Sequence, residues 1–186
     1  MQELGFNFNM SYFEELKKAM TLLANSEKVV FVGQAIKYAG TGLYDSLTHI
    51  PDSRKIEFPV AEYLQCGVVN GLAIQGWIPV SVIPRWNFLL MGTDQIVNHL
   101  DKLPLMSDGQ CTPKVIIRVA VGSEYPIDPQ DQHKGNFTKA FQSMCKTIDI
   151  IELLTAESIV PSYEMALNRT DGKSTILVEF GDLSKQ

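Results

Sequence analysis

Short, almost wholly apolar runs alternate with helix-compatible segments along this chain of 186 residues. In several of these runs the residues that would point to either face of a strand are all apolar, so such strands would be buried on both faces. Strands are expected at 29–32, 55–58, 78–83, 115–121, 148–153 and 175–180. Strands that alternate with helices are typical of a parallel sheet covered on both sides. We therefore predict an α/β fold with three layers, in which helices flank an open, mostly parallel sheet.

Helical periodicity accounts for the segments between these strands. Helices are expected at 12–24, 61–75, 88–102, 137–144 and 158–168, with a shorter one inside 34–47. Ser11 and Glu14 have the spacing of a capping box, which would fix the start of the first helix. The length suits one core, so we expect a single domain over 1–186, with flexible ends at 1–10 and 181–186.

Composition and charge argue against several classes of protein. The chain is 45% hydrophobic and 20% charged, with a formal net charge of −5 and no run of five Lys or Arg, so no nucleic-acid partner is expected. No apolar run approaches the roughly 20 residues that span a bilayer, and no signal-peptide pattern opens the chain, so we expect no membrane association. Three cysteines without a C-x-x-C pair favour a reducing, cytoplasmic setting.

The stretch Lys55–Gly76 joins a strand, a proline elbow and a helix. Pro59 ends the strand, and one carboxylate, Glu62, falls where the helix begins. Gly67 and Gly71 lie four residues apart, so they share one helix face, and each costs about 1 kcal/mol relative to Ala in a helix interior. Two such residues on one face suggest that another backbone approaches this helix closely.

Ligands of an open parallel sheet bind beyond the carboxyl ends of its strands. Here that edge comprises 33–42, 59–62, 84–88 and 122–133. Within it, Glu62 and His133 are the side chains best suited to proton transfer. Glu62 would also be favoured at a helix N-terminus by the dipole alone, and His133 could be a surface histidine. Trp86 and Phe88 could contact a ligand or belong to the core.

Several short motifs of known chemistry are absent from the sequence. It contains no G-x-G-x-x-G, no P-loop lysine pattern and no G-x-S-x-G. The histidines His49, His99 and His133 lack metal-ligand spacing, so we predict no metal held by this chain alone.

A set of longer stretches occurs in an informative order and spacing: SYFEELKKAM, VVFVGQAI, FPVAEYLQCGVVNGLAIQGWIPV, WNFLLMGTDQIVNHLDK and LPLMSDGQCTPKVIIR, then DQH and TILVEF. Together they resemble the pyrimidine-binding domain of thiamine-diphosphate enzymes, in particular the beta subunit of the 2-oxoacid dehydrogenases, with transketolase more distant. The resemblance covers nearly the whole chain. Each motif alone would be weak, but the combination is specific.

The resemblance implies roles for five residues. Glu62 matches the family's catalytic glutamate, whose carboxyl exchanges a proton with a ring nitrogen of the cofactor's aminopyrimidine. Phe88 matches an aromatic that packs on that ring, and Val60 matches an apolar wall beside it. His133 matches a histidine that assists the substrate or intermediate. Gln34, expected among the cofactor contacts, stands where the family usually has an acidic residue.

The resemblance also implies that thiamine diphosphate bridges two domains. The second domain would hold the diphosphate through Mg²⁺ with a G-D-G motif, which this sequence lacks. We therefore expect the pyrimidine-binding subunit of a split enzyme for 2-oxoacid decarboxylation or ketol transfer, inactive without a diphosphate-binding chain. The Gly67 and Gly71 helix face would form the homodimer or hetero-oligomer contact. A non-catalytic regulatory or scaffold domain, and a fragment of a longer beta subunit, stay open as alternatives.

Overall fold

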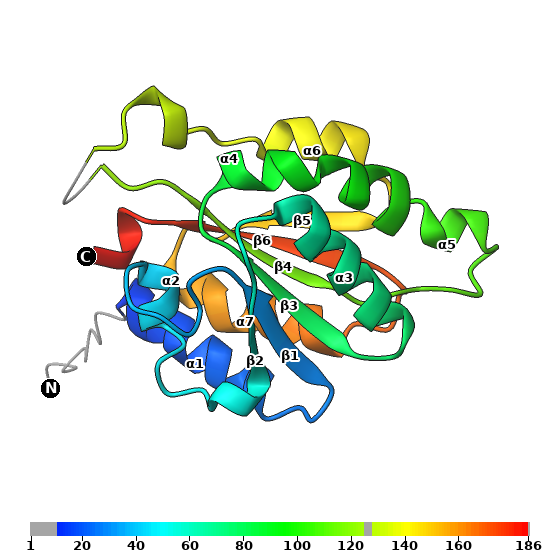
Figure 1. The fold of residues 1–186 in the computed structure, drawn as a ribbon, viewed down its shortest axis with the longest axis horizontal. Helices are drawn as coiled ribbons and strands as arrows, with labels where there is room; N and C mark the ends of the chain where they lie inside the picture. The colour runs from blue at the N-terminus through cyan, green and yellow to red at the C-terminus, as the bar shows by residue number, and fades with distance from the viewer. Residues whose placement is uncertain (1–10, 125–127, 186) are drawn as a thin grey trace, which may run out of the picture.

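The structure is a computed structural model that describes residues 11–124 and 128–185. Within them, six strands form one parallel sheet in the order β2-β1-β3-β4-β6-β5 (Figure 1). The strands are β1 (Val29–Gly33), β2 (Lys55–Glu57), β3 (Ile78–Ile83), β4 (Ile116–Val121), β5 (Ile148–Glu152) and β6 (Ser174–Phe180). Each lies within one residue of a predicted strand. The predicted fold class is therefore confirmed.

Helices cover both faces of this sheet (Figure 1). One face carries α1 (Tyr12–Ala24) and α7 (Ala156–Asn168), which also pack on each other. The other carries α3 (Glu62–Ile74), α4 (Trp86–Leu89) and α6 (Thr138–Met144). Two short helices, α2 (Gly42–Asp45) and α5 (Leu103–Met106), complete the set of labelled helices.

Each face of the sheet has its own apolar core, which explains why the strand sequences are apolar throughout. In β1, Phe31 contributes to the core under α1 and α7, whereas Val30 and Val32 contribute to the core under α3. Trp86 is fully buried in this second core, where its ring lies 5.0 Å from that of Phe141. Trp86 is therefore a core residue.

Two predicted helix details are wrong. Ser11 is the N-cap of α1, but its side chain makes no cap hydrogen bond, so the capping box does not form. The helix predicted at 88–102 begins earlier, at Trp86, and is irregular: a 3-10 turn at Leu90–Gly92 and a π-helical segment at Gln95–Leu100 follow α4. Sequence periodicity does not distinguish these tighter and wider turns from an α-helix.

The two ends of the chain differ in what the structure describes. Residues 1–10, expected to be flexible, lie outside the described residues. Leu183–Lys185 forms a 3-10 turn, and Leu183 packs against the core under α1. Flexibility at 181–186 and the single-domain division both stay predictions. Of the helices within the described ranges, none is long and apolar enough to cross a membrane.

Candidate functional site

The five predicted site residues follow four neighbouring strands of the sheet. Gln34 comes after β1, Val60 and Glu62 after β2, Phe88 after β3, and His133 after β4. Strands β2, β1, β3 and β4 are consecutive in the sheet, and all run in the same direction. The residues therefore lie along one edge, where ligands of such sheets bind.

Glu62 is the first residue of α3 and is nearly buried, at 8% exposure. The side-chain amide of Gln34 donates a hydrogen bond to Glu62 Oε1 at 2.8 Å. Among the described residues, Glu62 Oε2 accepts no hydrogen bond. An ionised carboxyl can accept several hydrogen bonds, so one oxygen remains available to a ring nitrogen or another donor.

A second carboxylate, Glu57, holds the loop that carries Gln34. It accepts hydrogen bonds from the three successive backbone N–H groups of 35–37, at 2.6, 3.0 and 2.9 Å. Ala35 has a left-handed backbone, with a φ of 49°. Glu57 ends β2, where it is paired with Gly33 of β1. Glu57 was not among the predicted site residues, because a charged residue at a strand end gives little signal by itself.

Phe88 and His133 form a second contacting pair at the same edge. Their rings meet edge to face, with centroids 5.2 Å apart and an interplanar angle of 64°. Both side chains are half-buried. His133 Nδ1 is buried and has no hydrogen-bond partner in the described part of the chain. Val60 is 81% exposed, so it can act as an apolar wall only against a ligand or another chain.

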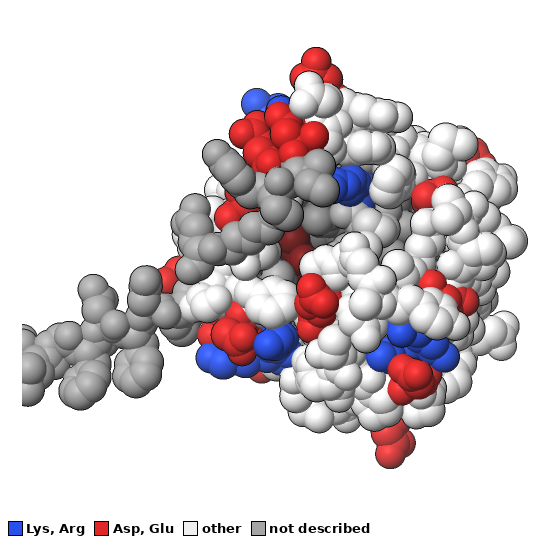
Figure 2. Space-filling view, turned by 60° about the vertical axis from the view of Figure 1, so that its left-hand side comes forward, with Lys and Arg blue, Asp and Glu red and all other residues white. Residues whose placement is uncertain are grey.

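A cavity of about 670 Å³ opens on another part of this edge. It is lined by α1, by residues 40–45 and by the ends of β3, β4 and β6. Figure 2 looks toward this edge and shows that the surface is hollowed there. None of the five predicted residues lines the cavity. Arg85 and Arg118 do, and the Nη1 atom of each is buried without a hydrogen-bond partner among the described residues.

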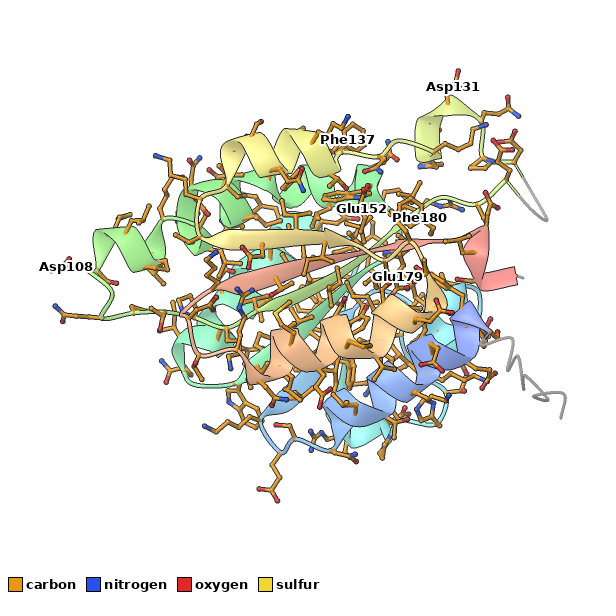
Figure 3. The ribbon with its side chains drawn as sticks, turned by 180° about the vertical axis from the view of Figure 1, so that it is seen from behind. Asp108, Asp131, Phe137, Glu152, Glu179 and Phe180 are labelled. Carbon is orange, nitrogen blue, oxygen red and sulfur yellow. The ribbon has the colours of Figure 1, made fainter. Side chains whose placement is uncertain are left out.

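Arg118 belongs to a buried polar cluster beneath the cavity. Its Nε and Nη2 donate to the two carboxylate oxygens of Glu179 at 2.5 and 2.9 Å. Glu179 lies near the end of β6 (Figure 3), and the Tyr163 hydroxyl donates to its Oε1 at 2.6 Å. Burial raises the pKa of Tyr163 well above its usual value, and the charge on Glu179 raises it further. Tyr163 therefore remains a hydrogen-bond donor.

The sequence contains a signal for this cluster, although the cluster was not predicted from it. Arg118 lies between apolar residues of its strand, and Glu179 directly follows the apolar run Ile176–Val178. A charge that is fully buried needs a partner of opposite sign, so two such charges predict a pair.

The outward face of α3 is apolar and exposed. Its stripe consists of Tyr63, Leu64, Gly67, Val68, Gly71 and Ile74, and the exposed Val60 lies just before the helix. A Cβ added to Gly71 would meet nothing within 4 Å, and one added to Gly67 would meet only the Gln95 side chain, at 3.4 Å. No described backbone makes the close approach predicted there. A close approach to α3 occurs instead at Gly92, where a Cβ would collide with the Cys66 thiol.

Within the described ranges, no three His, Cys, Asp or Glu side chains are grouped so that they could hold a metal ion. The chemistry available at the edge is therefore that of a carboxylate, an amide, an imidazole and an aromatic ring.

Comparison with curated proteins finds relatives that are longer than this chain. No family model matches. The mitochondrial pyruvate dehydrogenase E1 component subunit beta of Drosophila melanogaster is 27% identical over 141 residues, which cover 73% of this chain and 37% of that protein. The 3-methyl-2-oxobutanoate dehydrogenase subunit beta of Mycobacterium tuberculosis is 29% identical over 101 residues, 52% of this chain and 29% of that protein. This chain thus spans well under half the length of these relatives.

Comparison with solved structures supports the fold. A structure titled split gene transketolase, inactive beta4 tetramer, has a TM-score of 0.69 at 18% identity and covers 93% of this chain and 52% of its own. Transketolase from Campylobacter jejuni has a TM-score of 0.71 at 13% identity and covers 92% and 26%. The predicted resemblance is confirmed: this chain is homologous to beta subunits of 2-oxoacid dehydrogenases and has the transketolase-like α/β fold.

Proposed function

We propose that this chain is the pyrimidine-binding subunit of a thiamine-diphosphate-dependent enzyme that decarboxylates a 2-oxoacid or transfers a ketol group. Glu62 is the observation that carries the proposal. It is nearly buried at the start of a helix, with one oxygen held by Gln34 and the other free. Thiamine diphosphate, when bound, supplies a carbon nucleophile for addition to a carbonyl group.

The residues of this edge fit the aminopyrimidine part of that cofactor. The free Glu62 oxygen would hydrogen-bond a ring nitrogen and exchange a proton with it, which is general acid–base chemistry. Phe88 would stack on the ring, and Val60 would cover its apolar side. Burial of Glu62 keeps bulk water from competing for the same proton.

The substrate would lie between His133 and the cavity. Gly122 joins these two places: its Cα has no side chain, and the guanidinium of Arg85 and the backbone carbonyl of His133 both pack against it. In this arrangement His133 Nδ1 would contact the reacting end of the substrate. Arg85 would pair with a substrate carboxylate, because arginine recognises carboxylates through paired N–H groups.

A partner chain would supply the rest of the cofactor site. This sequence has no G-D-G motif, so we assign the diphosphate and its Mg²⁺ to a second, diphosphate-binding subunit. The exposed apolar stripe on α3 is the surface we assign to a subunit contact, in a homodimer or a hetero-oligomer. Gly67 and Gly71 lie in this stripe and would let another helix approach the α3 backbone closely.

A second candidate is a regulatory or scaffold domain that has kept the fold without the chemistry. Lys134, next to His133, pairs with Glu124 at 3.1 Å and with Asp128 at 3.2 Å. These pairs hold Glu124 and Asp128 close to Lys134, which would suit a closed site. Gln34 in place of an acidic residue also favours this reading.

Cofactor binding by the assembled protein separates the two candidates. The partner would be recovered from the source organism on the tagged chain, and thiamine diphosphate with Mg²⁺ would be titrated calorimetrically into the chain alone and into the complex. We expect weak binding by the chain alone, tight binding by the complex, and turnover of a 2-oxoacid or a ketose. A complex that binds no cofactor would support the scaffold reading.

A further inference from the structure

We infer that Glu57 is a positioning residue for Glu62 and that it acts through the loop that carries Gln34. The inference rests on the proposed function, because the value of a fixed Glu62 carboxyl lies in proton exchange with a ligand. Glu57 itself would touch neither the cofactor nor the substrate. Its role follows from three contacts in series: Glu57 to the 35–37 turn, that turn to Gln34, and Gln34 to Glu62.

The first contact is an anion site made of backbone. Three successive N–H groups, those of 35–37, converge on the Glu57 carboxylate at 2.6 to 3.0 Å. Such concave arrangements of N–H groups bind anions, and hydrogen bonds to a charged acceptor are roughly twice as strong as neutral ones. Ala35, at a φ of 49°, is in a conformation that a non-glycine residue keeps only when its surroundings hold it there. The Glu57 carboxylate provides that hold.

The second contact fixes Gln34 from both sides. Glu57 is paired with Gly33 in the sheet, and the Phe58 N–H donates to the Gly33 carbonyl at 2.8 Å. Gly33, just before Gln34, is therefore held by the β1–β2 ladder. The 35–37 turn, just after Gln34, is held by the Glu57 side chain. Gln34 thus has little backbone freedom, and its amide is placed 2.8 Å from Glu62 Oε1.

The third contact determines which Glu62 oxygen is free. Gln34 Nε2 is an N–H donor, so it can hold an ionised oxygen but has no carboxyl proton to share. Oε1 is thereby engaged, and Oε2 is left to face a ligand. An acidic residue at position 34 could compete for the proton that Glu62 would exchange with the ligand. Gln34 orients the Glu62 carboxyl without that competition.

The chain contains a matched control for a purely structural role. Asp101 also uses a carboxylate to hold a turn, because its Oδ1 accepts the backbone N–H groups of Lys146 and Thr147 at 2.7 Å each. That turn precedes β5, the outermost strand on the side of the sheet opposite to β2, which Glu62 follows. Like Glu57→Gln, Asp101→Asn should lower stability, because it weakens hydrogen bonds between backbone N–H groups and a carboxylate. Unlike Glu57→Gln, it should not change the position of Gln34.

The test uses nuclear magnetic resonance of the ¹⁵N-labelled chain without any cofactor. In Glu57→Gln we expect amide hydrogen exchange at 35–37 to speed up by about tenfold or more. We also expect the Gln34 side-chain amide resonance to move toward its position in Glu62→Gln. Asp101→Asn should leave that resonance unmoved. An unmoved Gln34 resonance in Glu57→Gln would overturn the inference.

A shorter acid provides a second variant if Glu57→Gln does not fold. Glu57→Asp keeps the charge but withdraws it by one methylene, so the Gln34 resonance should take an intermediate position. Full wild-type behaviour at both 35–37 and Gln34 in Glu57→Asp would count against the inference. The geometry requires the length of the Glu57 side chain as well as its charge.

In the assembled enzyme, kcat and cofactor affinity provide a second measurement of the role of Glu57. Glu57→Gln should lower kcat by roughly 10–100-fold, the usual effect of losing a group that orients a reacting residue, with a much smaller change in cofactor affinity. Equal losses in kcat from Glu57→Gln and Asp101→Asn would assign both to stability and reject positioning. If no cofactor binds the complex, the proposed function fails while the resonance test still decides the role of Glu57.

Discussion

Helices α1 and α3 have the same length, 13 residues, and lie on opposite faces of one sheet, but their outer surfaces differ. The exposed side of α1 carries the charged residues Glu14 and Lys18. Ion pairs join Glu14 to Lys17 at 3.1 Å and the buried Glu15 to Lys18 at 2.6 Å. The exposed side of α3 contains the apolar stripe that includes its two glycines, and no charged residue.

This difference is the reason why the proposed subunit contact is placed on α3 and not on α1. A helix whose solvent side is charged needs nothing further, whereas an exposed apolar stripe marks an interaction surface. Glu62 is the first residue of α3, so the candidate acid and the uncovered surface belong to one element. A partner that covers the stripe would also come close to the site.

Core truncation gives the largest expected contrast between the helices. Leu16→Ala on α1 removes a side chain that is 2% exposed, and we expect it to lower the free energy of unfolding by about 2–5 kcal/mol. Leu64→Ala on α3 removes one that is 55% exposed, and we expect a change within about 0.5 kcal/mol in the isolated chain. Urea unfolding of the two variants measures both. Similar losses would show that the α3 surface is already buried within this chain.

A glycine substitution should separate stability from association. Nothing lies within 4 Å of a Cβ at Gly71, so Gly71→Ala should stabilise the isolated chain by up to about 1 kcal/mol, through helix propensity. The same methyl group would hold a partner backbone away, so we expect partner affinity to fall by about tenfold or more. Isothermal calorimetry with the recovered partner measures this. Lys18→Ala, on the outer side of α1, is the control and should leave partner affinity unchanged.

The smallest expected effect concerns charges at the end of α7, on the same face of the sheet as α1. Hydrogen bonds from Arg169 lower the pKa of Asp171 to about 2. Because the folded pKa lies below the unfolded one, the pair adds stability above about pH 4, and that stability is lost as the pH falls toward 2. The Asp171 side chain is half exposed, so the contribution should stay within about 1 kcal/mol.

Titration of the Asp171 carboxyl by ¹³C resonance tests this assignment. Arg169→Gln should raise the pKa of Asp171 toward its ordinary value of 3.8. An Asp171 that titrates near pH 4 in both proteins would show that Arg169 does not hold it in solution.

The strands and most helices could be predicted because their signals are local. The apolar runs end at glycine, proline or polar residues, and the predicted and observed bounds of α1 are identical. Features that depend on contacts between distant segments could not be predicted in this way. Ser11 has a capping spacing but makes no side-chain cap bond, and the turn geometry between Leu90 and Leu100 follows from packing that periodicity does not report.

The candidate site was predicted in part. Motif order led to Glu62, Gln34, Phe88 and His133, and the structure places them along one edge as two contacting pairs. The Glu57 carboxylate escaped notice, because its partners are backbone N–H groups about 20 residues earlier in the chain, at 35–37. A sequence shows which side chains carry charge, but not which turn of the backbone folds around one.

Proton exchange at the thiazolium carbon of bound cofactor tests the central claim most directly. The assembled enzyme would be loaded with thiamine diphosphate and Mg²⁺, transferred to deuterated water and quenched with acid, and the remaining proton at that carbon counted by NMR. If Glu62 is the proton-exchanging group, Glu62→Gln should slow the exchange by about 10²–10⁴-fold. Glu164→Gln, the same change at an exposed position of α7, should exchange like the wild type. Equal exchange rates in wild type and Glu62→Gln would contradict the account.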